Sequence, residues 1–162
     1  MPRPATSSAI AIRSATPADA ARLAAQRGRL FQELGQYRSP AHRSAFEQEA
    51  EAAFRQGLSD GTCLAWLADT GSATVGSVAL LIYPRLPSPA SPARREGYLL
   101  NVYTDPDWRS VGIATTLVVT AIKKARELGL ARIRLHATAK GQPVYAAQGF
   151  AGRHDEMELT LD

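Results

Sequence analysis

Apolar and polar residues follow two different periods over the first third of the chain. Residues 10–13 alternate with a period of two, which predicts a short strand. Thr16 and Pro17 supply a capping hydroxyl and a first-turn proline, so we expect a helix that continues to Gly35. Apolar side chains recur at helical spacing over about 40–56 and predict a second helix. A strand and two helices therefore precede most of the sheet.

Strand-like runs follow these helices. Residues 63–69 and 74–82 are separated by a turn sequence at 70–73 and predict an antiparallel hairpin. Residues 98–104 are apolar on both faces, which is typical of a central strand covered on each side. Four prolines within residues 84–92 exclude regular structure there and predict an exposed loop. That loop is either functional or a spacer.

The last third of the chain continues the alternation of helices and strands. We expect a helix over about 112–128, a strand through Ile133, Leu135 and Ala137, and a short helix near 141–148. Two final strands are expected near 149–154 and 156–161. With 162 residues, these elements predict one α/β (α+β) domain spanning 1–162, in which residues 1–8 are flexible.

Composition excludes several classes of protein. No apolar run approaches the ~20 residues that cross a bilayer, and the N-terminus lacks the apolar block of a secretory signal, so we expect a cytoplasmic protein without membrane contact. The excess of 19 basic over 15 acidic residues is scattered, with no array of basic and aromatic residues, and we expect no nucleic-acid partner.

Cysteine and histidine provide little chemistry. Cys63 is the single cysteine and lies in an apolar run, which is typical of a small buried side chain. His42, His136 and His154 are far apart and lack metal-ligand spacing, so we expect no metal site.

The junction before the helix at 112–128 is the most informative position. A helix that begins at Gly112 presents unpaired N–H groups and the positive end of its dipole, which suit a pyrophosphate. No Gly-Lys-Ser/Thr follows, and Gly-x-Gly-x-x-Gly is missing, so neither a Walker A loop nor a dinucleotide fingerprint is present. An ordinary helix start is the alternative.

Three segments together identify a family. Pro106-x-x-Arg109-x-x-Gly112-x-Ala114 is followed about thirty residues later by Tyr145-x-x-x-Gly149-Phe150, and residues 12–19 precede both. This order resembles the GNAT N-acetyltransferase superfamily over nearly the whole chain. The resemblance implies a GNAT-type domain with a mixed, mainly antiparallel sheet of about six or seven strands and about four helices. It also implies a splayed central strand that binds acetyl-CoA.

The resemblance assigns the residues of the cofactor site. The amides of the loop at Gly112 would hold the pyrophosphate, with Arg109 ordering the loop or touching phosphate, and the central strand would bind the thioester and pantetheine. The Val102 amide would bind the acetyl oxygen. The alternative for the strand is complete pairing in the core. The implied cofactor-binding residues are Val102, Tyr103, Thr104, Arg109, Val111, Gly112, Ile113, Ala114, Thr115, Thr138 and Tyr145.

The implied catalytic residues are Tyr145, Val102 and Glu96. Tyr145 would lie near the sulfur as an acid or as a stabiliser of the thiolate, or else simply pack its helix on the sheet. Some relatives carry a glutamate where this chain has Tyr98, so Glu96, two residues earlier, is the candidate base; the alternative is a solvated carboxylate. Thr138 stands where many relatives have asparagine and is expected to cap the short helix.

These features predict an acetyl-CoA-dependent N-acetyltransferase that acts without a covalent intermediate or metal on a primary amine of an unidentified small molecule or peptide. An inactive acyl-CoA-binding sensor of the same fold is the alternative. Arg85, Arg94 and Arg95 would suit an acceptor that also carries an anionic group. By analogy with relatives, we expect a homodimer.

Overall fold

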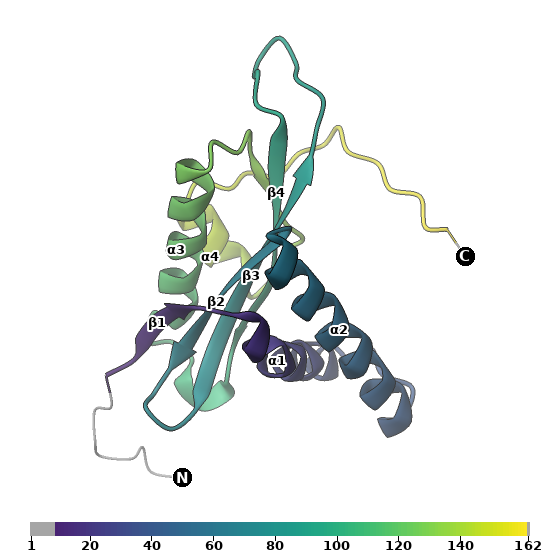
Figure 1. Cartoon of the computed structure of the whole chain (residues 1–162), viewed down its shortest axis with the longest axis vertical. Coiled ribbons are helices and arrows are strands. Elements are labelled where there is room, and N and C mark those ends of the chain that lie inside the picture. The colour runs from purple at the N-terminus through teal and green to yellow at the C-terminus, as the bar shows by residue number, and fades with distance from the viewer. Residues whose placement is uncertain (1–8, 162) are drawn as a thin grey trace.

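The computed structural model describes residues 9–161, so the expected flexibility of residues 1–8 lies outside the described residues. Within this range the chain forms one five-stranded sheet in the order β1-β2-β3-β4-β5, with helices on both faces (Figure 1). The elements are β1 (Ala11–Ser14), α1 (Ala20–Glu33), α2 (Pro40–Asp60), β2 (Cys63–Asp69), β3 (Thr74–Pro84), β4 (Arg95–Thr104), α3 (Ile113–Glu127), β5 (Ile133–Arg134) and α4 (Gln142–Ala147), with 3-10 turns at Pro17–Asp19 and Pro106–Trp108.

The two faces of the sheet have separate cores. Trp66, Val78 and Leu99 pack with α3 on one face, whereas Leu67 and Ala79 pack with α1 and α2 on the other. Figure 1 shows α3 and α4 on one side of the strands and α1 and α2 on the opposite side. The expectation of a sheet covered on each face is therefore confirmed.

Strands β1 to β4 are antiparallel neighbours, and the hairpin of β2 and β3 is confirmed. Strand β5 lies parallel to β4 but pairs with it only at Gly97↔Ile133 and Tyr98↔Arg134. Because β5 ends at Arg134, the expected extension of this strand through Leu135 to Ala137 is wrong.

The expectation of six or seven strands is wrong for the described part of the chain, because residues 149–154 and 156–161 form no strand there. Met157, Leu159 and Leu161 have the alternation of a strand, yet they are 82–100% exposed. An alternating pattern becomes a strand only where a neighbour supplies hydrogen bonds and an apolar face, and among the described residues no strand pairs with this segment.

Helix α2 begins at Pro40. Ser39 caps it, because its Oγ accepts a hydrogen bond from the His42 amide (3.1 Å). The helix continues to Asp60 rather than ending before Gly57. A Cβ on Gly57 would lie 2.7 Å from the Cys63 Cβ, so this glycine allows α2 to approach β2. Gly61, with φ +79°, is the residue that ends the helix.

A β-bulge interrupts β4 at Asn101, which has a φ of 57°. Ala79 pairs with Leu100 and Ser77 with Tyr103, so two residues of β4 lie opposite Val78. The Asn101 amide nitrogen donates to Ser77 Oγ (3.1 Å) and to the Leu23 carbonyl (3.5 Å). These contacts bind the bulge to β3 and α1.

The proline-rich segment projects from the end of the sheet as an exposed loop between β3 and β4 (Figure 1). Arg85 holds the base of this loop, because the Arg85 guanidinium donates to the Ala93 carbonyl (2.6 Å) and lies 3.5 Å from Glu96.

Across residues 9–161, no helix is both long enough and apolar enough to cross a bilayer.

Candidate active site

Strands β4 and β5 separate immediately after Tyr98 and Arg134, and we call this region the fork. On its β5 side, β4 has no strand partner within residues 9–161 from Leu99 to Thr104. The bulge directs Leu100 toward the α1 and α2 core and Val102 toward the α3 core. The strand is therefore splayed from its neighbour, as the resemblance implies, and is not paired on both sides over its whole length.

The loop before α3 has two residues with positive φ, Ser110 at 63° and Gly112 at 88°. The first hydrogen bond of the helix runs from the Thr116 amide to the Gly112 carbonyl (3.0 Å). The amides before Thr116 thus precede the first hydrogen bond of the helix, and they lie at the positive end of the helix dipole. A Cβ on Gly112 would meet no described atom within 4 Å, so an anion can approach this backbone.

Arg109 orders this loop through contacts to α1 and β4. Its Nε donates to the Thr104 carbonyl (2.9 Å), and its Nη2 donates to both carboxylate oxygens of Glu33 (2.8 Å each). The Tyr103 hydroxyl also donates to Glu33 Oε1 (2.9 Å). Glu33 therefore links the end of α1 to the loop and the fork.

Sequence reasoning missed Glu33, because a glutamate in the last turn of an amphipathic helix belongs to no recognisable motif. Burial opposes its ionisation, but the bonds from Arg109 and Tyr103 prevail and lower the pKa of Glu33. Burial and the neighbouring Glu33 raise the pKa of Tyr103 to about 12. The Tyr103 phenol thus stays protonated and available as a donor.

Tyr145 lies on α4 and packs edge-on against Phe150, with ring centroids 5.9 Å apart. Both rings and Val102 contact the same core on the α3 face. Burial raises the pKa of Tyr145, so its phenol is protonated at neutral pH. Thr138 Oγ accepts a hydrogen bond from the Gly141 amide (3.2 Å) just before α4. Because Gly141 is the N-cap and has no side-chain cap, the expectation that Thr138 caps this helix is wrong.

Glu96 is 5% exposed and is not the solvated carboxylate of the alternative interpretation. Its oxygens lie 2.7 Å from Arg132, 3.5 Å from Arg85 and 3.7 Å from Arg134. Burial opposes its ionisation, but the hydrogen bonds from Arg132 and Tyr83 and the nearby guanidinium charges lower the pKa of Glu96. The role of base stays a prediction for Glu96, and these contacts do not support it.

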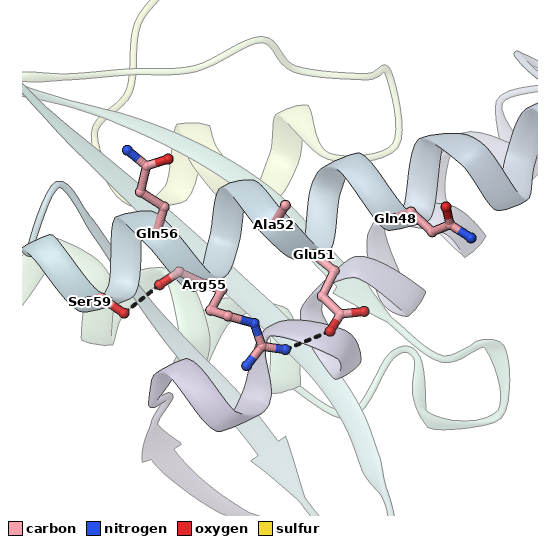
Figure 2. A pocket seen from close by; sticks show the side chains of 6 residues that line it. All are labelled: Gln48, Glu51, Ala52, Arg55, Gln56 and Ser59. Carbon is pink, nitrogen blue, oxygen red and sulfur yellow. Dashed lines mark hydrogen bonds and ion pairs between the residues drawn. The ribbon is translucent and has the colours of Figure 1, made fainter.

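Two surface hollows lie outside the fork. One, of about 450 Å³, is lined by six side chains of α2 alone: Gln48, Glu51, Ala52, Arg55, Gln56 and Ser59 (Figure 2). Its charged members pair with each other, since Arg55 donates to Glu51 at 2.6 Å. The other, of about 410 Å³, lies between α1 and the turn after β4 and includes Glu33 and Tyr103. The second hollow adjoins the Arg109 contacts.

In the part of the chain that the structure describes, no three His, Cys, Asp or Glu side chains gather as a metal site. His42 Nδ1 accepts a hydrogen bond from the Arg38 amide (3.2 Å), and His136 contacts Tyr98. The histidines are therefore separate from one another.

Comparison with known proteins identifies relatives of this chain. Residues 31–150 match the model of the Acetyltransferase (GNAT) family. A predicted acetyltransferase of Clostridium acetobutylicum, solved with acetyl-CoA, has a TM-score of 0.85 and 25% identity over 94% of this chain and 96% of its own. A GCN5-related N-acetyltransferase of Ralstonia eutropha JMP134 has a TM-score of 0.81 and 28% identity over 94% and 99%.

A curated relative is the glucosamine 6-phosphate N-acetyltransferase of Trypanosoma brucei brucei, which is 29% identical over 87 residues. This match covers 54% of the present chain and 57% of the relative, less than two thirds of the relative's length. The family match covers most of the chain, including α3 and the loop before it, and the two solved structures share its fold over nearly their whole length. The chain therefore belongs to the GNAT acetyltransferase family.

Proposed function

We propose that this protein transfers an acetyl group from acetyl-CoA directly to a primary amine. The observation that carries the proposal is the fork between β4 and β5 beside the open amides at the start of α3. An open strand edge and a helix start together suit a ligand with an extended amide-containing arm and a pyrophosphate.

The residues present fit acetyl-CoA. The amides of residues 111–115 would bind the pyrophosphate at the position where Gly112 leaves open space. Backbone groups of Val102, Tyr103 and Thr104 would bind the pantetheine arm along the unpaired edge, and Thr104 Oγ is a buried oxygen without a partner in the described part of the chain. Bound there, acetyl-CoA supplies an activated thioester, and the Val102 amide would donate to its acetyl oxygen.

Direct transfer is favoured because the cysteine is remote from the fork. Cys63 lies in the core between β2 and α2, and burial raises the pKa of its thiol to about 11. A protonated, buried thiol is a poor nucleophile. Tyr145, whose phenol is protonated, would instead hydrogen-bond the departing thiolate on the α3 face.

We infer that the acceptor enters on the α1 face and carries an anionic group beside its amine. Two of the arginines that the sequence suggested for this anionic group are already engaged within the protein. Arg85 is bound to Glu96 and loop carbonyls, and Arg95 donates to the Leu128 carbonyl (3.2 Å). Arg27 of α1 is half-buried, stacks on Phe31 at 4.8 Å and has no carboxylate partner within residues 9–161. A desolvated guanidinium without a counter-charge suits a carboxylate or phosphate.

This placement agrees with a relative named for glucosamine 6-phosphate, which bears both an amine and a phosphate. Arg27→Gln should raise the acceptor KM about tenfold with little change in kcat, because one charge-assisted contact is lost. Arg126→Gln, at an exposed site near the end of α3, is the matched control. An unchanged KM in the Arg27 variant would exclude this subsite.

Isothermal titration with acetyl-CoA tests the cofactor site. Gly112→Glu should weaken binding by about 100-fold or more, because it adds bulk and a negative charge beside the pyrophosphate. Gly129→Glu is a matched control. Gly129 also has a positive φ of 64° and open space beside it, but it follows the C-terminal end of α3, at the opposite end of the helix from Gly112. Equal affinity in the Gly112 variant and the parent would refute the loop assignment.

An acyl-CoA-binding sensor is the second candidate, because the arginines around Glu96 leave the expected base engaged. Release of free thiol from acetyl-CoA in the presence of amines separates the two functions. Turnover that falls strongly in Tyr145→Phe supports the enzyme. Binding without turnover across amine and peptide panels supports the sensor.

A further inference from the structure

Tyr98 and His136 contact each other at the fork, the tyrosine from β4 and the histidine from the segment that follows β5. Tyr98 is the last residue of β4 paired with β5, and His136 follows the end of β5 by two residues. The Tyr98 hydroxyl is hydrogen-bonded to His136 Nδ1, and the two ring centroids are 5.7 Å apart at 48°. On the other side of the imidazole, Nε2 lies 3.7 Å from Glu158 Oε2.

Tyr98 faces the side on which we propose that the acceptor enters. It precedes Leu100 by two residues with no bulge between them, so both side chains lie on the α1 face of the sheet. His136 is largely exposed, with a side-chain exposure of 80%, and can therefore exchange protons with solvent. The pair thus connects the interior of the fork to water.

Three carboxylates near the fork, apart from Glu158, are bound to arginines. Glu33 is held by Arg109 at 2.8 Å, Glu96 by Arg132 at 2.7 Å, and Asp105 by Arg29 at 2.9 Å. A carboxylate paired with a guanidinium is a weaker proton acceptor than a free one. Imidazole, in contrast, is the side chain suited to proton exchange near neutral pH.

We propose that Tyr98 and His136 together accept the proton that the acceptor amine loses, an inference that rests on the proposed function. As the amine nitrogen bonds to the acetyl carbon and the carbon–sulfur bond breaks, the nitrogen gives its proton to the Tyr98 oxygen while Tyr98 gives its own to His136 Nδ1. The thiolate takes up a proton from water or from Tyr145, which solvent then reprotonates, and the imidazolium returns its proton to solvent. No net proton is consumed.

The surrounding charges are compatible with this relay. Burial and the nearby Glu158 raise the pKa of Tyr98, whereas His136 and Arg27 of α1 oppose them. The Tyr98 phenol is thus protonated at neutral pH, so it can accept the amine proton only while it gives its own proton to the imidazole. Glu158 would stabilise the imidazolium, and Arg134 and Glu156 pair with each other alongside at 3.3 Å.

Tyr98→Phe and His136→Gln test the pair, with His154→Gln, at an exposed histidine, as the control. Each test variant should lower kcat by about 100-fold and the double variant by no more, because the two residues act as one unit. Acetyl-CoA affinity, measured by titration, should stay at the parent value.

A second readout does not depend on turnover. In nitrogen-15 NMR spectra of the parent, His136 Nδ1 should have the shift of a hydrogen-bonded acceptor, and Tyr98→Phe should remove it. Turnover within twofold of the parent in both variants, or an unchanged Nδ1 signal in Tyr98→Phe, would refute the role of Tyr98 and His136 and leave the proposed acetyltransferase function intact. A parent that releases no thiol from acetyl-CoA with any amine overturns the proposed function and the pair with it.

Discussion

At the scale of single residues, one buried carboxylate joins three elements at the start of the fold. Asp19 accepts two hydrogen bonds from Arg13 (2.8 and 2.9 Å) and one from the Thr16 amide (2.8 Å). Arg13 also donates to Asp69 (2.7 Å). The capping residue of the first helical turn is therefore tied to β1 and β2, and the bond from Arg13 holds the pKa of Asp19 well below its usual range.

Asp19→Asn should lower the free energy of unfolding by about 2 kcal/mol at pH 7, because charge-assisted bonds to a buried group are lost. Since the folded pKa is depressed, Asp19 stabilises the fold above its unfolded pKa of about 4, and this stabilisation disappears as pH falls through the folded value. Urea unfolding should thus show a gap between parent and variant at pH 7 that shrinks below about pH 4. Glu49→Gln, on the exposed side of α2, should show no gap at either pH.

Glu33 acts at the same scale on the proposed cofactor site. Glu33→Gln should raise the Kd for acetyl-CoA about tenfold, because Arg109 loses the carboxylate that orders the loop. Titration calorimetry measures this effect. An unchanged Kd would mean that the Thr104 carbonyl alone is sufficient to position Arg109.

At the scale of elements, the bulge in β4 changes which face of the sheet the side chains after Asn101 contact. Asn101 tolerates positive φ better than a β-branched residue does, and its amide is buried against Ser77 and Leu23. Regular alternation through this position would turn Val102 toward the α1 face.

Asn101→Val should destabilise the fold by about 3 kcal/mol, because backbone strain adds to the lost hydrogen bonds. Asn101→Gly should cost about 1–2 kcal/mol, since glycine adopts the same φ and loses only those bonds. Chemical unfolding of the two variants compares them directly. Equal losses in both would show that positive φ at this position is unimportant.

At the scale of the whole molecule, the sheet ends at the short strand β5, and the chain beyond Phe150 runs outside it, with surface ion pairs from Glu156 to Arg134 and from Glu158 to His136 (Figure 1). The apolar residues of the segment 151–161 are exposed, and its ion pairs, such as Arg153 with Asp155, lie at the surface. Surface ion pairs contribute about 1 kcal/mol or less. The core thus draws little stability from this segment.

Ending the chain after Phe150 should therefore change the free energy of unfolding by about 1 kcal/mol or less, as measured by urea denaturation of both forms. A loss above about 2 kcal/mol would show that the segment packs on a surface in solution. Light scattering at the same concentrations would show whether that surface belongs to a second copy, which also tests the predicted homodimer.

Local patterns were sufficient for most elements of the fold. The capped start at Thr16, the hairpin and the helix after Gly112 each depend on residues within a few positions of one another, because turns, caps and helical periods are short-range. The open backbone of the loop before α3 is likewise a local feature, whereas the anion site there stays a prediction. Where a pattern needed a distant partner, as in the segment 156–161, the prediction of a strand was wrong.

The amino-acid order by itself determined the family resemblance, the open backbone at Gly112 and the covered sheet. Only the tertiary structure decided that Glu96 is held by arginines, that Glu33 binds Arg109 and that Tyr98 meets His136. These partners are 36, 76 and 38 positions apart. Whether a side chain is free to exchange a proton depends on which charges the folded chain brings beside it, and no local period encodes that.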